Sequence, residues 1–197
     1  MSEFASQSPR PVFSPLDLQS RSVAWQVGAV VAGTLFLALS SYIEVPMVPV
    51  PVTMQTFAVT MVGALYGWRL GAITIVAWLV EGAMGFPVLA GGASGVHHFA
   101  GPTGGYLLAF PVTGALVGWL AERGWNGDSV GLAFLSMLLG NALCLVLGAA
   151  LLSLMIGWEQ AIVHGVAPFL VGGALKSALA AAILKLAAPG SAGRPAR

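Results

Sequence analysis

The hydrophobic residues of this chain are grouped into long, almost uninterrupted runs. Residues 23–43, 104–121, 130–156 and 166–188 form four of these runs. The hydrocarbon core of a bilayer is about 30 Å thick and a helix rises about 1.5 Å per residue, so roughly 20 apolar residues are needed to cross it. Each run therefore predicts one transmembrane α-helix.

The apolar stretch from residue 54 to residue 85 is too long for a single crossing. Its roughly 32 residues would form a helix of about 48 Å. At residues 67–71 two glycines flank Arg69, the only basic residue of the stretch, and such a cluster favours a turn. We therefore expect two short helices here, which brings the predicted number of membrane-spanning helices to six.

The basic residues support this count independently. If the N-terminus is cytoplasmic, seven of the eight Lys and Arg residues fall on the cytoplasmic side, as the positive-inside rule requires. They are Arg10, Arg21, Arg69, Arg123, Lys185, Arg194 and Arg197. The predicted fold is an all-α bundle of six transmembrane helices in the plasma membrane, with both termini cytoplasmic. Residues 22–188 form the membrane domain between two cytoplasmic tails, residues 1–21 and 189–197.

The composition supports the membrane assignment and excludes several other classes of protein. Apolar residues make up 57% of the chain and charged residues 8%, against about 25% charged residues in soluble domains. The formal net charge of +1 gives no electrostatic basis for binding nucleic acid. Cys144 is the only cysteine, so an intramolecular disulfide is impossible.

Known catalytic and cofactor-binding motifs are absent from the sequence. No Ser-His-Asp set, paired carboxylates or His-Glu-x-x-His motif is present, and the glycine clusters of residues 86–105 are not followed by Lys-Ser or Lys-Thr as in an ATP-binding loop. His97 and His98 are adjacent and should point apart in a regular element, which argues against a metal site. We expect a protein that is not an enzyme and that holds no cofactor or metal.

Two unusual segments lie on the predicted outer side. In residues 44–53, Pro46, Pro49 and Pro51 forbid a helix and favour an extended path. The segment is too apolar for an ordinary exposed loop, so it is either a lid over an outward-facing pocket or a packed structural loop. In residues 86–105, the glycines include Gly91, Gly92, Gly104 and Gly105, which would let the backbone approach helices or a ligand closely.

Four polar residues lie inside predicted spans and are candidates for a binding site. They are Gln55, Glu81, Asn141 and Lys176. An ionisable group within a span normally faces a cavity or the bundle interior, because its burial in lipid is costly. Lys176 lies about ten residues from either end of the last span, about 15 Å, which is too far for its side chain to reach the interface. It could lose its proton, pair with Glu81, or bind an acceptor on a ligand. Gln55 and Asn141 could instead only join helices by hydrogen bonds.

The first span carries small residues at a spacing of four. Ala24, Gly28 and Ala32 form one row, and Ala29 and Gly33 form a second. Such a surface allows another helix to approach closely. The rows predict either a docking face for a partner subunit or packing within the bundle.

Three segments, in this order, resemble the BioY family, the biotin-binding S components of energy-coupling factor transporters. The segments are Val50-Pro51-Val52-Thr53-Met54-Gln55-Thr56, Gly85-Phe86-Pro87-Val88-Leu89-Ala90-Gly91-Gly92 and Gly101-Pro102-Thr103-Gly104-Gly105-Tyr106-Leu107-Leu108. The resemblance covers residues 23–187. It implies a six-helix bundle that binds biotin near the outer face, with Thr53, Gln55 and Tyr106 of the motifs as candidate contacts.

The resemblance also implies partners. The family works with a transmembrane coupling protein and two ATP-hydrolysing subunits, so the ATP sites would lie in other chains. A homo-oligomer working without this module is an alternative that the sequence leaves open. An S component for another vitamin and a structural membrane protein without a small ligand are the alternative functions.

One position departs from the family pattern. The family commonly has Pro-Gly-Asp-x-x-Lys near the start of the last helix, and here Lys176 is kept while Gly173 stands where the Asp is expected. Biotin carries a ureido group and a carboxylate. Without the Asp the site needs another acceptor, for which Glu81 and Asn141 are the candidates.

Overall fold

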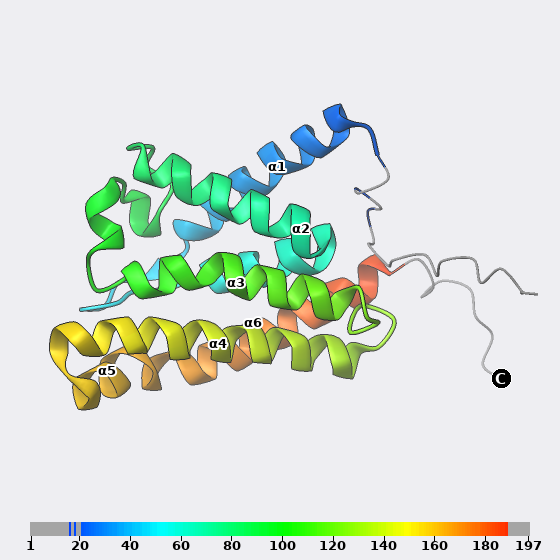
Figure 1. The fold of residues 1–197 in the computed structure, drawn as a ribbon. Coiled ribbons are helices and arrows are strands. Elements are labelled where there is room, and N and C mark those ends of the chain that lie inside the picture. The colour runs from blue at the N-terminus through cyan, green and yellow to red at the C-terminus, as the bar shows by residue number, and fades with distance from the viewer. Residues whose placement is uncertain (1–15, 17, 19–20, 189–197) are drawn as a thin grey trace, which may run out of the picture.

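The computed structural model describes residues 16, 18 and 21–188, so most of both predicted tails lie outside the described residues. Figure 1 shows a helical bundle with the following elements. They are α1 (Val23–Ser41), β1 (Glu44–Val45), β2 (Val52–Thr53), α2 (Gln55–Ala83), the 3₁₀ helices η2 (Ala90–Gly92) and η3 (Val96–Phe99), α3 (Gly104–Ala121), α4 (Val130–Ile156), α5 (Trp158–Gly165) and α6 (Ala167–Ala187).

Helix α2 reverses direction at Gly67, within the segment where a break is predicted. Gly67 has φ 77° and ψ 173°, a backbone conformation that residues other than glycine rarely adopt. This conformation ends the first half of the helix. A Cβ on Gly71 would lie 3.1 Å from the Cα of Gly63. In a straight helix these two residues would be about 12 Å apart, so the second half folds back along the first (Figure 1).

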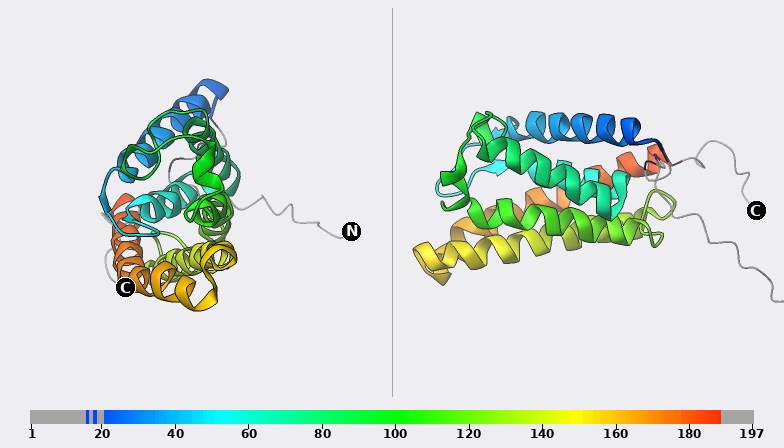
Figure 2. Two further views of the ribbon diagram at one scale, coloured as in Figure 1. Left: turned by 90° about the vertical axis from the view of Figure 1, so that its left-hand side faces the viewer. Right: turned by 45° about the horizontal axis from the view of Figure 1, so that its top comes forward.

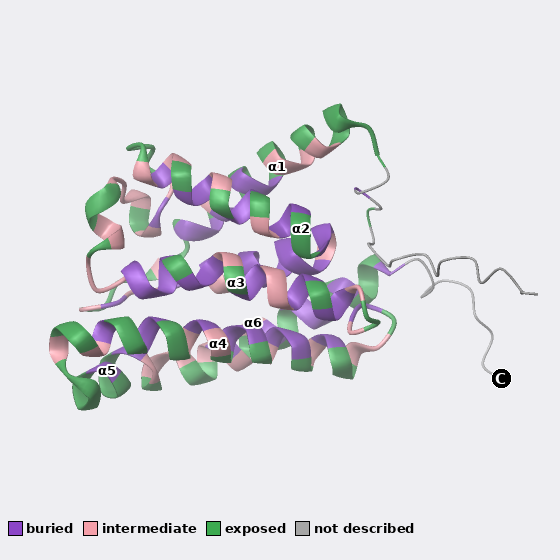
Figure 3. Cartoon of the chain, in the orientation of Figure 1, coloured by how far each residue is buried: buried purple, intermediate pink, exposed green. Residues whose placement is uncertain are grey.

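Five helical stretches of the described chain are long and apolar enough to cross a membrane. This count takes α2 as one stretch and α5 with α6 as another. The most apolar windows of α2 and α3 are 67% buried, whereas that of α1 is 22% buried. Helices α2 and α3 therefore form the centre of the bundle, and α1 lies at its edge against α2 (Figures 2 and 3).

Glycines set the close approach of α2 and α3. A Cβ on Gly63 would lie within 2.3 Å of the Gly114 carbonyl oxygen, and a Cβ on Gly118 within 2.6 Å of the Gly67 backbone. These four glycines belong to two similar sequence segments, residues 63–68 and 114–119, which thus pack against each other. Small residues at such crossings maximise backbone contact where no hydrophobic effect drives association.

The two ends of the bundle differ in chemistry. The start of α1, the Gly67 reversal, the α3–α4 connection and the end of α6 all lie at one end (Figure 1). Arg21, Arg69, Arg123 and Lys185 belong to these segments, so all four lie at this end. The proline-rich segment, η2, η3 and α5 lie at the opposite end (Figure 1).

Several short elements, including the 3₁₀ helices η2 and η3, were not predicted from the sequence. The all-α prediction missed the antiparallel pair of β1 and β2, in which Glu44 lies opposite Thr53. The predicted loop before the last span contains the short helix α5. Two-residue strands and an eight-residue amphipathic helix fall below the length at which hydrophobic runs give a signal.

Candidate functional site

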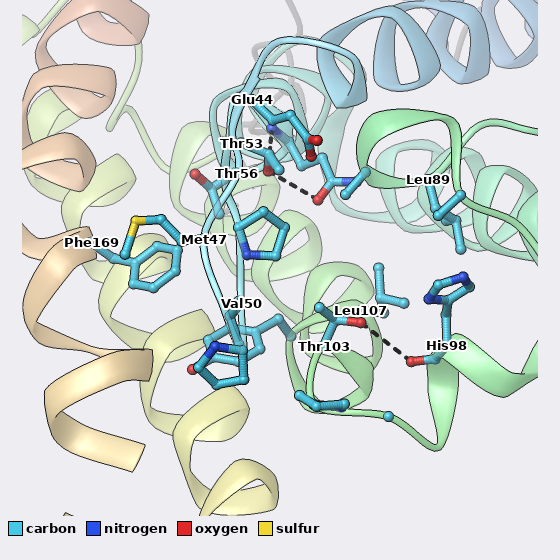
Figure 4. A pocket seen from close by; sticks show the side chains of 18 of the residues that line it. Glu44, Met47, Val50, Thr53, Thr56, Leu89, His98, Thr103, Leu107 and Phe169 are labelled. Atoms are coloured by element: carbon cyan, nitrogen blue, oxygen red, sulfur yellow. Dashed lines mark hydrogen bonds between the residues drawn. The ribbon is translucent and has the colours of Figure 1, made fainter. Parts of the chain in front are cut away.

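A cavity of about 480 Å³ lies at the end of the bundle opposite to the start of α1 and the end of α6. This size is within the range of small-molecule sites. Its wall is formed by the proline loop, defined here as residues 44–53, by the starts of α2 and α3 and by the η2–η3 region (Figure 4). One turn of α4 and the first half of α6 complete it. The apolar part of the wall includes Val50, Leu89, Leu107, Phe110, Cys144 and Phe169.

The proline loop covers one side of this cavity. Pro46, Pro49 and Pro51 all line it, and the Val50 side chain is only 4% exposed. The loop starts and ends in the β1–β2 pair, which brings its two ends together. The loop is thus part of the cavity wall, and its movement as a lid stays a prediction.

Lys176 of α6 reaches the end of the proline loop. Its Nζ donates hydrogen bonds to the Thr53 carbonyl oxygen and, at 3.4 Å, to Thr56 Oγ1. Both residues and Lys176 line the cavity. Among the described residues Lys176 forms no ion pair with Glu81, so that predicted partner is not used, and the ammonium is held by neutral oxygens.

Thr53 and Gln55 line the cavity and also hold the loop to the helices. The Thr53 hydroxyl donates to Gln55 Oε1 at 3.0 Å, and Gln55 Nε2 donates to Ser41 Oγ at 3.1 Å. Gln55 therefore ties the start of α2 to the end of α1. Tyr106 lines the cavity with its ring, while its hydroxyl donates to the Gly165 carbonyl at 2.8 Å.

Two predicted site residues lie outside the cavity wall. Glu81, in the second half of α2, does not line the cavity. Asn141 is buried between α4 and α6, where its Nδ2 donates to the Met137 carbonyl and to Ser177 Oγ, both at 3.0 Å. A Cβ on Gly173 would lie 3.9 Å from Asn141, so there is room for a side chain at the position of the family Asp.

The predicted loop glycines serve close packing rather than lining the cavity. A Cβ on Gly91 would lie 2.6 Å from Glu44 Oε1, and one on Gly92 3.1 Å from the Tyr42 ring. Gly91 and Gly92 also have positive φ angles, of 60° and 81°. Gly104 and Gly105 lie against the backbones of Phe99 and Gly148, which fixes the start of α3.

His97 and His98 line the cavity from η3. Their rings lie side by side, with centroids 4.2 Å apart, so the expectation that they point apart is wrong: a 3₁₀ turn does not separate neighbouring side chains as a strand does. Burial, and then the neighbouring His97, lower the pKa of His98. No group of three or more His, Cys, Asp or Glu that could hold a metal occurs among the described residues.

Glu44 is a charged cavity residue that the sequence did not identify. Among the described residues that form the cavity wall, it is the only acidic one. In the sequence its one distinguishing sign is a charge at the start of an otherwise apolar, proline-rich segment. The pairing of β1 with β2, which carries it to the wall, has no counterpart in the hydrophobic pattern.

Comparisons with known proteins agree on one family. The profile of the BioY family matches residues 14–192. A Pyrococcus horikoshii protein named probable biotin transporter BioY is 37% identical over 152 residues, which cover 76% of this chain and 89% of that protein. The biotin transporter BioY of Rhizobium etli is 34% identical over 169 residues, covering 82% of this chain and 90% of the relative.

A solved structure has the same architecture. The crystal structure of the S component for biotin from an ECF-type ABC transporter superposes with a TM-score of 0.73 at 26% identity, over 85% of this chain and 94% of that one. Because these relatives are transport proteins and the chain has several helices able to span a membrane, it is a multi-pass plasma-membrane protein and not an enzyme. The chain belongs to the BioY family.

Proposed function

We propose that this chain is the high-affinity biotin-binding subunit of a biotin uptake transporter and works with a separate ATP-hydrolysing module. The observation that carries the proposal is the cavity under the proline loop, with Lys176 on its wall. It lies in a chain that is similar along most of its length to an S component for biotin.

The chemistry of the cavity suits biotin. Biotin has an apolar bicyclic ring and aliphatic chain, with a ureido group at one end and a carboxylate at the other. The cavity offers an apolar wall that includes Leu89, Phe110 and Phe169, together with a few polar groups at its ends. Pockets with apolar walls and a small number of placed polar groups are typical of small-ligand sites.

We infer six membrane crossings with both chain ends in the cytoplasm. The reversal at Gly67 makes each half of α2 a short crossing. The four described basic residues at the end of the bundle where α1 begins and α6 ends support a cytoplasmic assignment for that end. The proline loop and the cavity then open toward the outside, and residues 22–188 form the membrane domain.

We infer that the exposed row of α1 docks the coupling subunit. Ala24, Gly28 and Ala32 are exposed, and a Cβ on Gly28 would meet nothing within 4 Å. The row lines a shallow groove together with Trp25 and Tyr66. ATP would be bound and hydrolysed by the partner subunits, and this chain would hold no cofactor.

Thermal unfolding of the detergent-purified protein tests the proposal. A ligand at 100 times its dissociation constant stabilises the folded state by about 2.7 kcal/mol, so biotin should raise the melting temperature visibly. A shift with another vitamin and none with biotin would point to a sister carrier. No shift with any vitamin would favour a structural membrane protein.

A further inference from the structure

Glu44 and Lys176 lie on the two sides of Thr53. Glu44 is opposite Thr53 in the β1–β2 pair. The Met54 amide donates to the Ile43 carbonyl, so the next pair, Glu44 and Thr53, is a non-hydrogen-bonded pair. In such a pair the two side chains are close, and the backbone carbonyls point away from the partner strand. The outward Thr53 carbonyl accepts the Lys176 ammonium. The cavity wall thus has a carboxylate on one side of Thr53 and an ammonium on the other.

The Glu44 carboxylate is the free acceptor of this wall. It forms no hydrogen bond or ion pair with any described residue, whereas Gln55 Oε1 already accepts the Thr53 hydroxyl. Space for the carboxylate exists because residue 91 is glycine: a Cβ there would lie 2.6 Å from Glu44 Oε1. The side chain is half-buried, so a ligand that binds here replaces part of its water.

We propose that Glu44 determines ligand specificity by accepting a ureido N–H of biotin, which places the ureido group at the Glu44–Lys176 end of the cavity. This inference rests on the proposed function. A ureido group presents N–H donors beside a carbonyl acceptor, which suits a wall with a carboxylate and an ammonium on the two sides of Thr53. Hydrogen bonds to charged partners are about twice as strong as those between neutral groups.

The same charge excludes the opposite orientation. A ligand carboxylate at this end would lie beside Glu44 and be repelled by it. At the other side of the cavity are His98 and Thr103, well separated from Glu44 and Thr53 (Figure 4). The Thr103 hydroxyl donates to the His98 carbonyl at 3.4 Å, whereas the His98 ring can donate a hydrogen bond to a carboxylate, so the acyl chain of biotin points toward His98.

The test measures the affinity of the purified full chain for biotin and for biotinamide, in which a neutral amide replaces the carboxylate. Glu44→Gln keeps the shape of the side chain and removes its charge. We expect it to weaken binding of both ligands by the same factor, about tenfold. Glu159→Gln, the same change on the exposed surface of α5, should leave both affinities unchanged.

The other possible results contradict either the role of Glu44 or the proposed biotin-binding function. Unchanged affinity for both ligands in Glu44→Gln would remove Glu44 from the site. Tighter binding of biotin with unchanged biotinamide would show that Glu44 faces the carboxylate, which reverses the orientation. If Glu44→Gln does not purify as a folded protein, Glu44→Asp serves instead, with an equal loss for both ligands expected from its shorter reach. A wild-type protein that binds neither ligand would contradict the proposed function itself.

Discussion

At the scale of single residues, Lys176 carries the sharpest prediction. Lys176→Ala removes the ammonium that joins α6 to Thr53 and Thr56 and that faces the cavity. We expect biotin affinity, measured by titration calorimetry, to fall at least tenfold, which corresponds to about 1.4 kcal/mol. The helices that surround the site do not depend on this contact, so the variant should still purify as a monodisperse particle.

Lys185→Ala is the matched control for this change. Lys185 is an exposed lysine in the last turn of the same helix, at the opposite end of the bundle. Its loss should leave biotin affinity unchanged. Wild-type affinity in Lys176→Ala would show that the cavity binds its ligand without this ammonium.

The sequence identified some site residues because their chemistry conflicts with their surroundings. Lys176 is a charge within a hydrophobic helix, and it lines the cavity. The same reasoning selected Asn141, which joins α4 to α6 through Ser177. Polarity within a span shows that a side chain needs a partner, but it does not show whether the partner is a ligand or another helix. Glu44 could not be found in this way because it lies outside the helices.

At the scale of elements, run length and glycine placement predicted the helices well. The break in α2 was predicted from two glycines around Arg69, and it occurs at Gly67. What the pattern could not predict was how the proline loop closes on itself. The β1–β2 pair has two residues in each strand and depends on the position of α6 and of Gly91, which are contacts between distant parts of the chain.

The proline loop should close more firmly over bound biotin. Val50 faces the cavity and is 4% exposed, whereas Val48 is 90% exposed and does not line it. In a Cys144→Ala background, a cysteine at position 50 should react about fivefold more slowly with a thiol reagent once biotin is present, because ligand binding holds the lid closed. A cysteine at position 48 should react at the same rate in both states. Equal rates at position 50 with and without biotin would make the loop a static wall.

At the scale of the whole molecule, α1 is the long helix whose packing depends mainly on one neighbouring helix. It packs mainly on α2 at the edge of the bundle, and most of its length is exposed. The sequence showed two rows of small residues but could not assign their directions, because both rows have the same spacing. The structure separates them: Ala24, Gly28 and Ala32 are exposed, whereas Gly33 is buried against Thr74 and Tyr66.

This separation predicts opposite results for two similar substitutions. Gly28→Leu adds a side chain where nothing lies within 4 Å, so folding and biotin binding should be unchanged. The bulk would hold a partner helix away, and biotin uptake by cells with the complete transporter should fall about tenfold. Ala32→Leu should behave in the same way. Gly33→Leu would instead collide with Thr74 Cγ2, 2.5 Å from the new Cβ, and should lower the melting temperature of the purified subunit. Normal uptake in Gly28→Leu and Ala32→Leu would show that the exposed row faces lipid rather than a partner.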